Sequence, residues 1–87
     1  MNIQLTTKQY SALLNIYGPP ECVHEMIMFS ELRNGKNILT GDDEDFDELL
    51  SLISEEIGEG LCPATNIEHL LSVCKKVDPS SLDWIGM

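Results

Sequence analysis

An apolar stripe with helical spacing in the middle of the chain constrains the fold more than any other feature. The stripe consists of Phe46, Leu49, Leu50, Ile53 and Ile57. These positions repeat every three or four residues, which places them on one face of an α-helix. The same spacing recurs at Tyr10, Leu13, Leu14 and Tyr17, and again at Ile67, Leu70, Leu71 and Cys74. Because each helix has only one apolar face, the helices must pack against one another around a shared core.

The sequence therefore predicts a mainly α fold, a compact bundle of three or four short helices. At 87 residues the chain is expected to form one small acidic domain over residues 1–87. Two capping boxes indicate helix starts: Thr6 with Gln9, and Thr65 with Glu68. We also predict a minor two-stranded β piece in which residues 2–5 pair with residues 37–40.

The segment between Pro19 and Gly35 admits two interpretations. A proline pair can begin a helix and a glycine can end one. On a helical wheel, one broad face would carry Cys22, Val23, Met26, Ile27 and Phe29. The dipeptide Asn34-Gly35 is equally typical of a β-hairpin turn. The wheel favours a helix over residues 20–33, and the hairpin stays open as the alternative.

The net charge of −10, from 15 acidic and 5 basic residues, limits the partners of this chain. Binding to phosphate groups depends on Lys and Arg, so direct contact with nucleic acid or with an anionic membrane is not expected. No apolar run approaches the roughly 18 residues that a membrane-spanning helix requires. The charge favours either a freely soluble protein or one whose partner is a basic protein.

The cysteines and the acidic run carry no metal or cofactor signature. Cys22, Cys62 and Cys74 are odd in number and form no C-x-x-C pair, which indicates reduced thiols and a cytoplasmic location. A calcium loop beginning at Asp43 would need Gly at its sixth position and Glu at its twelfth, where this chain has Glu48 and Ser54. We predict no metal site and no cofactor.

Catalytic motifs are also missing from the sequence. It contains no G-x-S-x-G motif, no glycine-rich phosphate loop and no H-E-x-x-H motif. We therefore predict that the protein is not an enzyme.

The distribution of acids identifies one candidate binding face. Residues 37–74 contain ten acids and no Lys or Arg. The acids from Asp42 to Asp45 suit the positive end of a helix dipole and need no further explanation. Later in the same helix the acids oppose the dipole or form like-charged i, i+4 pairs. We predict a partner-binding face made of Glu44, Asp47, Glu48, Glu55, Glu56 and Glu59.

In size and charge the chain resembles small acidic nuclease inhibitors, such as bacteriocin immunity proteins and phage-encoded nucleic-acid mimics. The resemblance is one of composition only, because no sequence motif is shared. The predicted function is a non-catalytic acidic binding protein, an inhibitor of the immunity type or a regulator. It would dock a basic, nucleic-acid-acting protein. The alternative is a homo-oligomeric structural or accessory module that self-associates through Met26, Met28 or Trp84, with charge that confers only solubility.

Overall fold

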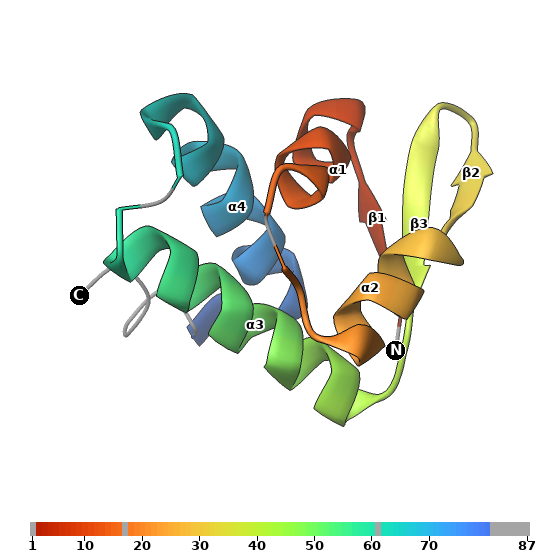
Figure 1. The fold of residues 1–87 in the computed structure, drawn as a ribbon. Coiled ribbons are helices and arrows are strands. Elements are labelled where there is room, and N and C mark those ends of the chain that lie inside the picture. Colours follow the sequence, from red (N-terminus) through yellow and green to blue (C-terminus); the bar gives the residue numbers. More distant parts are fainter. Residues whose placement is uncertain (1, 17, 61, 81–87) are drawn as a thin grey trace.

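Four helices and three short strands follow one another in the computed structural model, which describes residues 2–16, 18–60 and 62–80 (Figure 1). The elements, in chain order, are β1 (Asn2–Leu5), α1 (Thr7–Leu14), α2 (Glu21–Met28), β2 (Glu31–Arg33), β3 (Lys36–Thr40), α3 (Asp43–Gly58) and α4 (Ala64–Val77). The mainly α prediction is confirmed. No helix in the described ranges is both long and apolar enough to cross a membrane.

The three strands form an antiparallel sheet with the order β1-β3-β2. β1 pairs with β3 in a register that runs from Asn2 opposite Thr40 to Leu5 opposite Asn37. This confirms the predicted pairing of residues 2–5 with 37–40. Alternate residues of these strands face the core, where Ile3, Leu5 and Leu39 are buried.

Residues 20–33 combine the two alternatives, and the prediction of a continuous helix is wrong beyond Met28. α2 ends there, and β2 pairs with β3 from Glu31 opposite Ile38 to Arg33 opposite Lys36. Asn34 and Gly35 have φ angles of 51° and 77°, which suit the two central positions of a type I′ hairpin turn. Phe29, expected on the apolar face, is 81% exposed because the chain has already left the helix.

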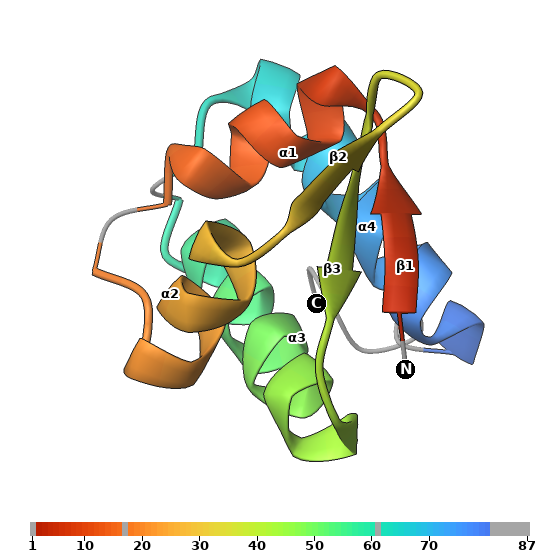
Figure 2. The same ribbon diagram turned by 90° about the vertical axis from the view of Figure 1, so that its right-hand side faces the viewer.

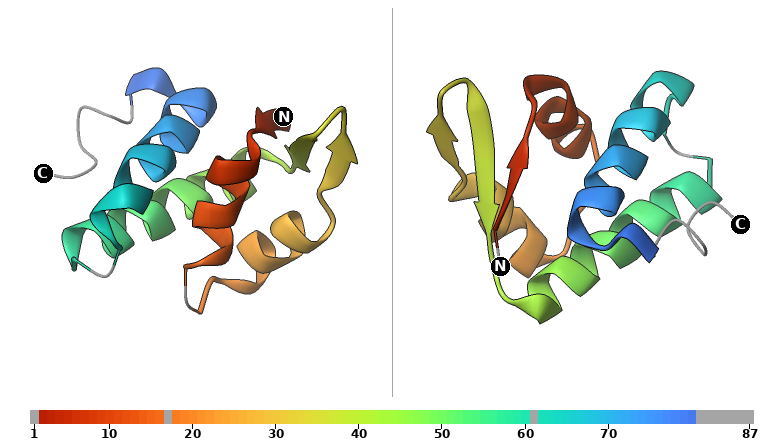
Figure 3. Two further views of the ribbon diagram at one scale, coloured as in Figure 1. Left: turned by 90° about the horizontal axis from the view of Figure 1, so that it is seen from above. Right: turned by 180° about the vertical axis from the view of Figure 1, so that it is seen from behind.

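The core lies where the helices meet one another and the sheet. α3 buries Phe46, Leu49, Leu50 and Ile53 of its predicted stripe. It contacts α4 and also α2, beside which it runs in Figure 2. α1 lies between the sheet and α4 (Figure 1). α4 crosses α3 on the side shown from behind in Figure 3 and buries Leu70, Val73 and Cys74.

Two local predictions need correction. α1 has the predicted Thr6–Gln9 capping box, but it buries Gln9 and Ala12 while Leu14 is 56% exposed. α4 begins at Ala64, with Pro63 as its N-cap residue and no side-chain cap. Thr65 therefore lies inside the first turn and not at the N-cap position, so the predicted Thr65 capping box does not form.

Candidate functional site

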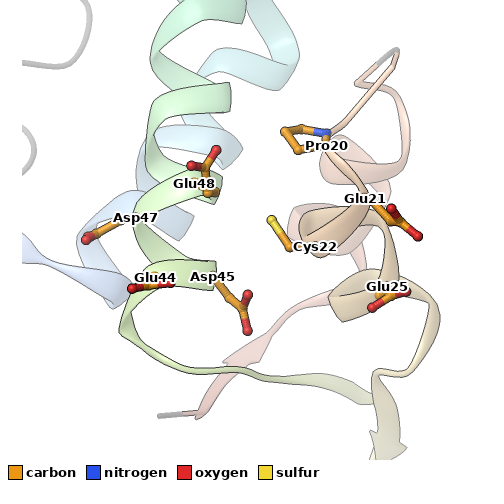
Figure 4. Close-up of a pocket in the computed structure, with 8 residues that line it drawn as sticks. All are labelled: Pro20, Glu21, Cys22, Glu25, Glu44, Asp45, Asp47 and Glu48. Carbon is orange, nitrogen blue, oxygen red and sulfur yellow. The ribbon is translucent and has the colours of Figure 1, made fainter.

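A groove of about 780 Å³ lies between α2 and the N-terminal half of α3. It is lined by Pro20, Glu21, Cys22, Glu25, Glu44, Asp45, Asp47 and Glu48 (Figure 4). Six of these eight side chains are acidic. We call this surface the acidic groove.

Helical spacing places acids on both walls of the acidic groove. Glu21 and Glu25 are one turn apart on α2, and Glu44 and Glu48 are one turn apart on α3. No Lys or Arg lines the groove. Within the described residues the single ion pair joins Arg33 to Glu31 at 2.8 Å, so the acids of the groove are not neutralised by a basic side chain. Such a surface concentrates negative potential.

Asp45 has a structural role as well as a place in the groove. The Asp45 main-chain N–H donates to the Asp42 side chain at 2.9 Å, and the Asp42 N–H donates to Asp45 Oδ2 at 3.2 Å. This reciprocal capping box begins α3 and holds the Asp45 side chain in place. In Figure 4 Asp45 points from α3 toward α2, and the Cys22 thiol points back toward α3.

The structure divides the predicted binding face into two parts. Glu44, Asp47 and Glu48 line the acidic groove, whereas Glu55, Glu56 and Glu59 lie at the other end of α3. Glu55 lies eleven positions after Glu44, about 16 Å along a helix axis. We call this second group the distal acids.

Glu56 lies close to Cys62, just before α4. Burial, and then the negative charge of Glu56, raises the pKa of the Cys62 thiol. The distal acids thus lie at the end of α3 from which the chain passes to α4. They are not part of the groove that faces α2.

The α2 wall of the groove was missed from the sequence. Glu21 and Glu25 have i, i+4 spacing on a predicted helix, which was the available signal. Their proximity to the acids of α3 depends on how the two helices pack, and no sequence pattern specified that packing.

An exposed apolar border adjoins the acidic groove. A smaller cavity of about 210 Å³ shares Cys22, Glu25 and Asp45 with the groove and extends to Phe29 and Thr40. Beyond it Met28 and Leu32 are also exposed, at 65% and 70%. Met26, proposed as part of a self-association surface, is buried, and Trp84 lies outside the described residues.

The thiols differ in environment and form no disulfide. Cys22 is half-buried at the acidic groove, whereas Cys74 is fully buried between helices. Burial raises the pKa of Cys74 to about 12. Among residues 2–16, 18–60 and 62–80, no three His, Cys, Asp or Glu side chains are grouped so that they could hold a metal ion.

Comparison with known proteins gives no relative from which a function could be transferred: no protein-family model matches the chain, and neither the curated proteins nor the solved structures contain a significant match.

Proposed function

We propose that this chain is a non-catalytic binding protein that docks the basic surface of another protein in the acidic groove. The observation that carries the proposal is the convergence of six carboxylates from two helices on one concave surface without a Lys or Arg. Helix stability alone does not select this arrangement, because like charges one turn apart on the same helix repel.

The chemistry of the groove favours a protein partner with clustered Lys or Arg side chains. Carboxylate pairs accept the forked N–H donors of Arg in a bidentate geometry. A nucleic acid would be repelled, but a protein that itself binds nucleic acid presents the required basic surface. Covering that surface would inhibit or regulate the partner, as an immunity-type inhibitor does. The three thiols, none in a disulfide, suit action in the reducing cytoplasm.

The expected association is fast and sensitive to salt. A net charge of −10 attracts a basic surface over the Debye length, about 10 Å at 0.1 M ionic strength. Charges at the rim of an interface act mainly on the association rate. The exposed Phe29 at the border of the groove offers apolar contact once the partner has docked.

The test compares two double variants that change net charge equally. Glu25→Lys/Glu48→Lys reverses one acid on each wall of the acidic groove, and Glu55→Lys/Glu59→Lys reverses two distal acids at the C-terminal end of α3. Basic proteins are first captured from an extract of the native organism with a salt-graded elution. Each captured protein is then titrated with the wild type and both variants, and association rates are measured at several salt concentrations.

The groove variant is expected to lose affinity by on the order of a hundredfold, with a shallower salt dependence. The distal variant is expected to lose only a few-fold, through its lower net charge. Equal losses in the two variants would show that attraction depends on net charge alone and would reject the acidic groove as the docking site.

A further inference from the structure

The sheet has two edges, and they are protected differently. On β1, the Lys76 ammonium donates to the main-chain oxygen of Gln4 at 2.6 Å. On β2, no strand or helix of the described residues pairs with the outer edge (Figure 1). An uncovered strand edge presents main-chain donors and acceptors to any other strand that approaches it.

The hairpin geometry identifies the groups that β2 presents. In an antiparallel pair closed by a two-residue turn, the residues flanking the turn exchange both main-chain hydrogen bonds, and the next pair points outward. Arg33 and Lys36 flank the turn, so the N–H and C=O of Leu32 point away from β3. The same alternation, continued from β2 through β3 to β1, points the main-chain groups of Gln4 away from β3. Lys76 donates its hydrogen bond to the Gln4 oxygen on that outer edge.

We propose that two copies of the chain pair through β2, antiparallel and centred on Leu32, to form one continuous sheet. In this register the two Leu32 residues exchange two main-chain hydrogen bonds. Glu31 of each copy then lies directly opposite Arg33 of the other, so the charges are complementary. Direct cross-strand neighbours of opposite charge stabilise an antiparallel pair, whereas like charges destabilise it.

The surroundings of β2 also suit a second copy. Leu32 is 70% exposed, and Met28 and Phe29 just before the strand are 65% and 81% exposed, so apolar area is available for burial. From Phe29 to Gly41 the chain carries one acid, Glu31, against two bases, Arg33 and Lys36. The local charge of this segment is positive, whereas the helices on either side of it, α2 and α3, are acidic, so two copies repel less when they meet here than at those helices. The small contact area indicates a dimer that dissociates on dilution.

The test is sedimentation equilibrium of the full chain over a wide concentration range, with three variants. Arg33→Glu makes both cross-strand pairs repulsive. Glu31→Arg/Arg33→Glu exchanges the charges, which restores complementarity in this register and returns the net charge to the wild-type value. Lys8→Glu on α1 is the matched control, because it changes net charge as Arg33→Glu does and lies outside β2. Far-UV circular dichroism verifies that each variant is folded.

The wild type is expected to rise from 9.7 kDa toward twice that mass as concentration increases. Arg33→Glu should weaken the dimer by on the order of tenfold or more, the double exchange should restore it, and Lys8→Glu should change it far less. A wild type that stays at 9.7 kDa would overturn the proposal, as would a dimer that Arg33→Glu leaves intact. Failure of the double exchange to restore the dimer would reject the register. These outcomes are independent of the acidic groove, whose variants change neither Glu31 nor Arg33.

Discussion

The Lys76 ammonium joins two parts of the chain that are 72 residues apart, through its 2.6 Å hydrogen bond to the main-chain oxygen of Gln4. It also donates to Gln9 Oε1 at 3.0 Å. Burial, and then the positive charge of Lys36, lowers the pKa of Lys76, so these acceptors hold the ammonium where its surroundings disfavour charge. One side chain of α4 thereby fixes β1 and the start of α1.

Lys76→Met is expected to lower the free energy of unfolding by about 1 kcal/mol, because the Gln4 oxygen and the buried Gln9 amide lose a charged donor. Lys75→Met is the control, since Lys75 is exposed in the same helical turn, as Lys76 is, but has no such hydrogen bond among the described residues. Urea unfolding of both variants measures the difference. Equal unfolding free energies for Lys76→Met and Lys75→Met would contradict a structural role for Lys76.

Gly35→Ala should destabilise the hairpin by about 1 kcal/mol, because a side chain at a φ of +77° strains the backbone. Nothing lies within 4 Å of the added Cβ, so backbone strain is the only cause. Gly58→Ala, at the end of α3 and equally open, should instead stabilise by about 0.5–1 kcal/mol. Opposite shifts in thermal midpoint confirm this account, and shifts of the same sign contradict it.

Asp42→Ala should lower the free energy of unfolding by about 1 kcal/mol, because the Asp45 N–H loses its acceptor at the start of α3. Asp43→Ala removes an acid from the same turn without removing a cap hydrogen bond, so its loss should be smaller. Urea unfolding compares the two. If Asp43→Ala lowers the free energy of unfolding by as much as Asp42→Ala, the helix dipole and not the capping box accounts for the stabilising effect of the acids at the start of α3.

Glu48→Gln should raise stability by about 0.2–0.5 kcal/mol at low salt, because it removes repulsion from Glu44 one turn earlier. The gain should vanish near 1 M salt, where the Debye length is about 3 Å. A double-mutant cycle with Glu44→Gln isolates the pair: the two gains should not add fully. A loss of stability at low salt would mean that Glu48 has a stabilising partner.

Cys74 should make the fold sensitive to alkali. The pKa of the Cys74 thiol is about 12 in the folded chain against an ordinary value of 9.0, so the folded state binds more protons between these values. Stability from this group is complete below pH 9 and is lost as pH rises toward 12, by about 1.4 kcal/mol per pH unit.

Cys74→Ala should be less stable than the wild type at neutral pH, because the substitution leaves a small cavity. Above pH 9 its unfolding free energy should depend less on pH than that of the wild type. Unfolding free energies of both proteins across this range, under reducing conditions, give the comparison. Parallel curves for the two proteins would rule out the thiol as the cause of the alkaline loss.

Local patterns predicted much of this fold. The stripe on α3 follows from side-chain periodicity, which one short segment contains in full. The pairing of β1 with β3 was expected from two short extended segments, and the structure confirms it. Gln9 illustrates what such patterns omit: it is buried, while Leu14 is exposed, and its side chain meets Lys76 from the far end of the sequence. The end of α2 was missed because the helical wheel outweighed the turn signal of Asn34 and Gly35.

Only the α3 wall of the acidic groove was predicted from the sequence. The acids of α3 were visible as an excess that helix electrostatics does not explain. Glu21 and Glu25 oppose them only because α2 packs beside the first half of α3, a tertiary relationship. The same packing separates the distal acids from the groove, which no wheel drawn for α3 alone distinguishes.

The shared position of Asp45 in the capping box and in the acidic groove has a consequence for how this surface can change by mutation. Most acids of the groove are free to drift toward neutral residues without harm to folding, and Glu48 is expected to do so with a gain. Asp45 is more constrained, because its side chain must accept the Asp42 N–H at the first turn of α3. Selection for a folded chain alone therefore keeps a side-chain acceptor at this wall, of the kind that Gln9 provides in α1, even in a descendant that has lost its partner.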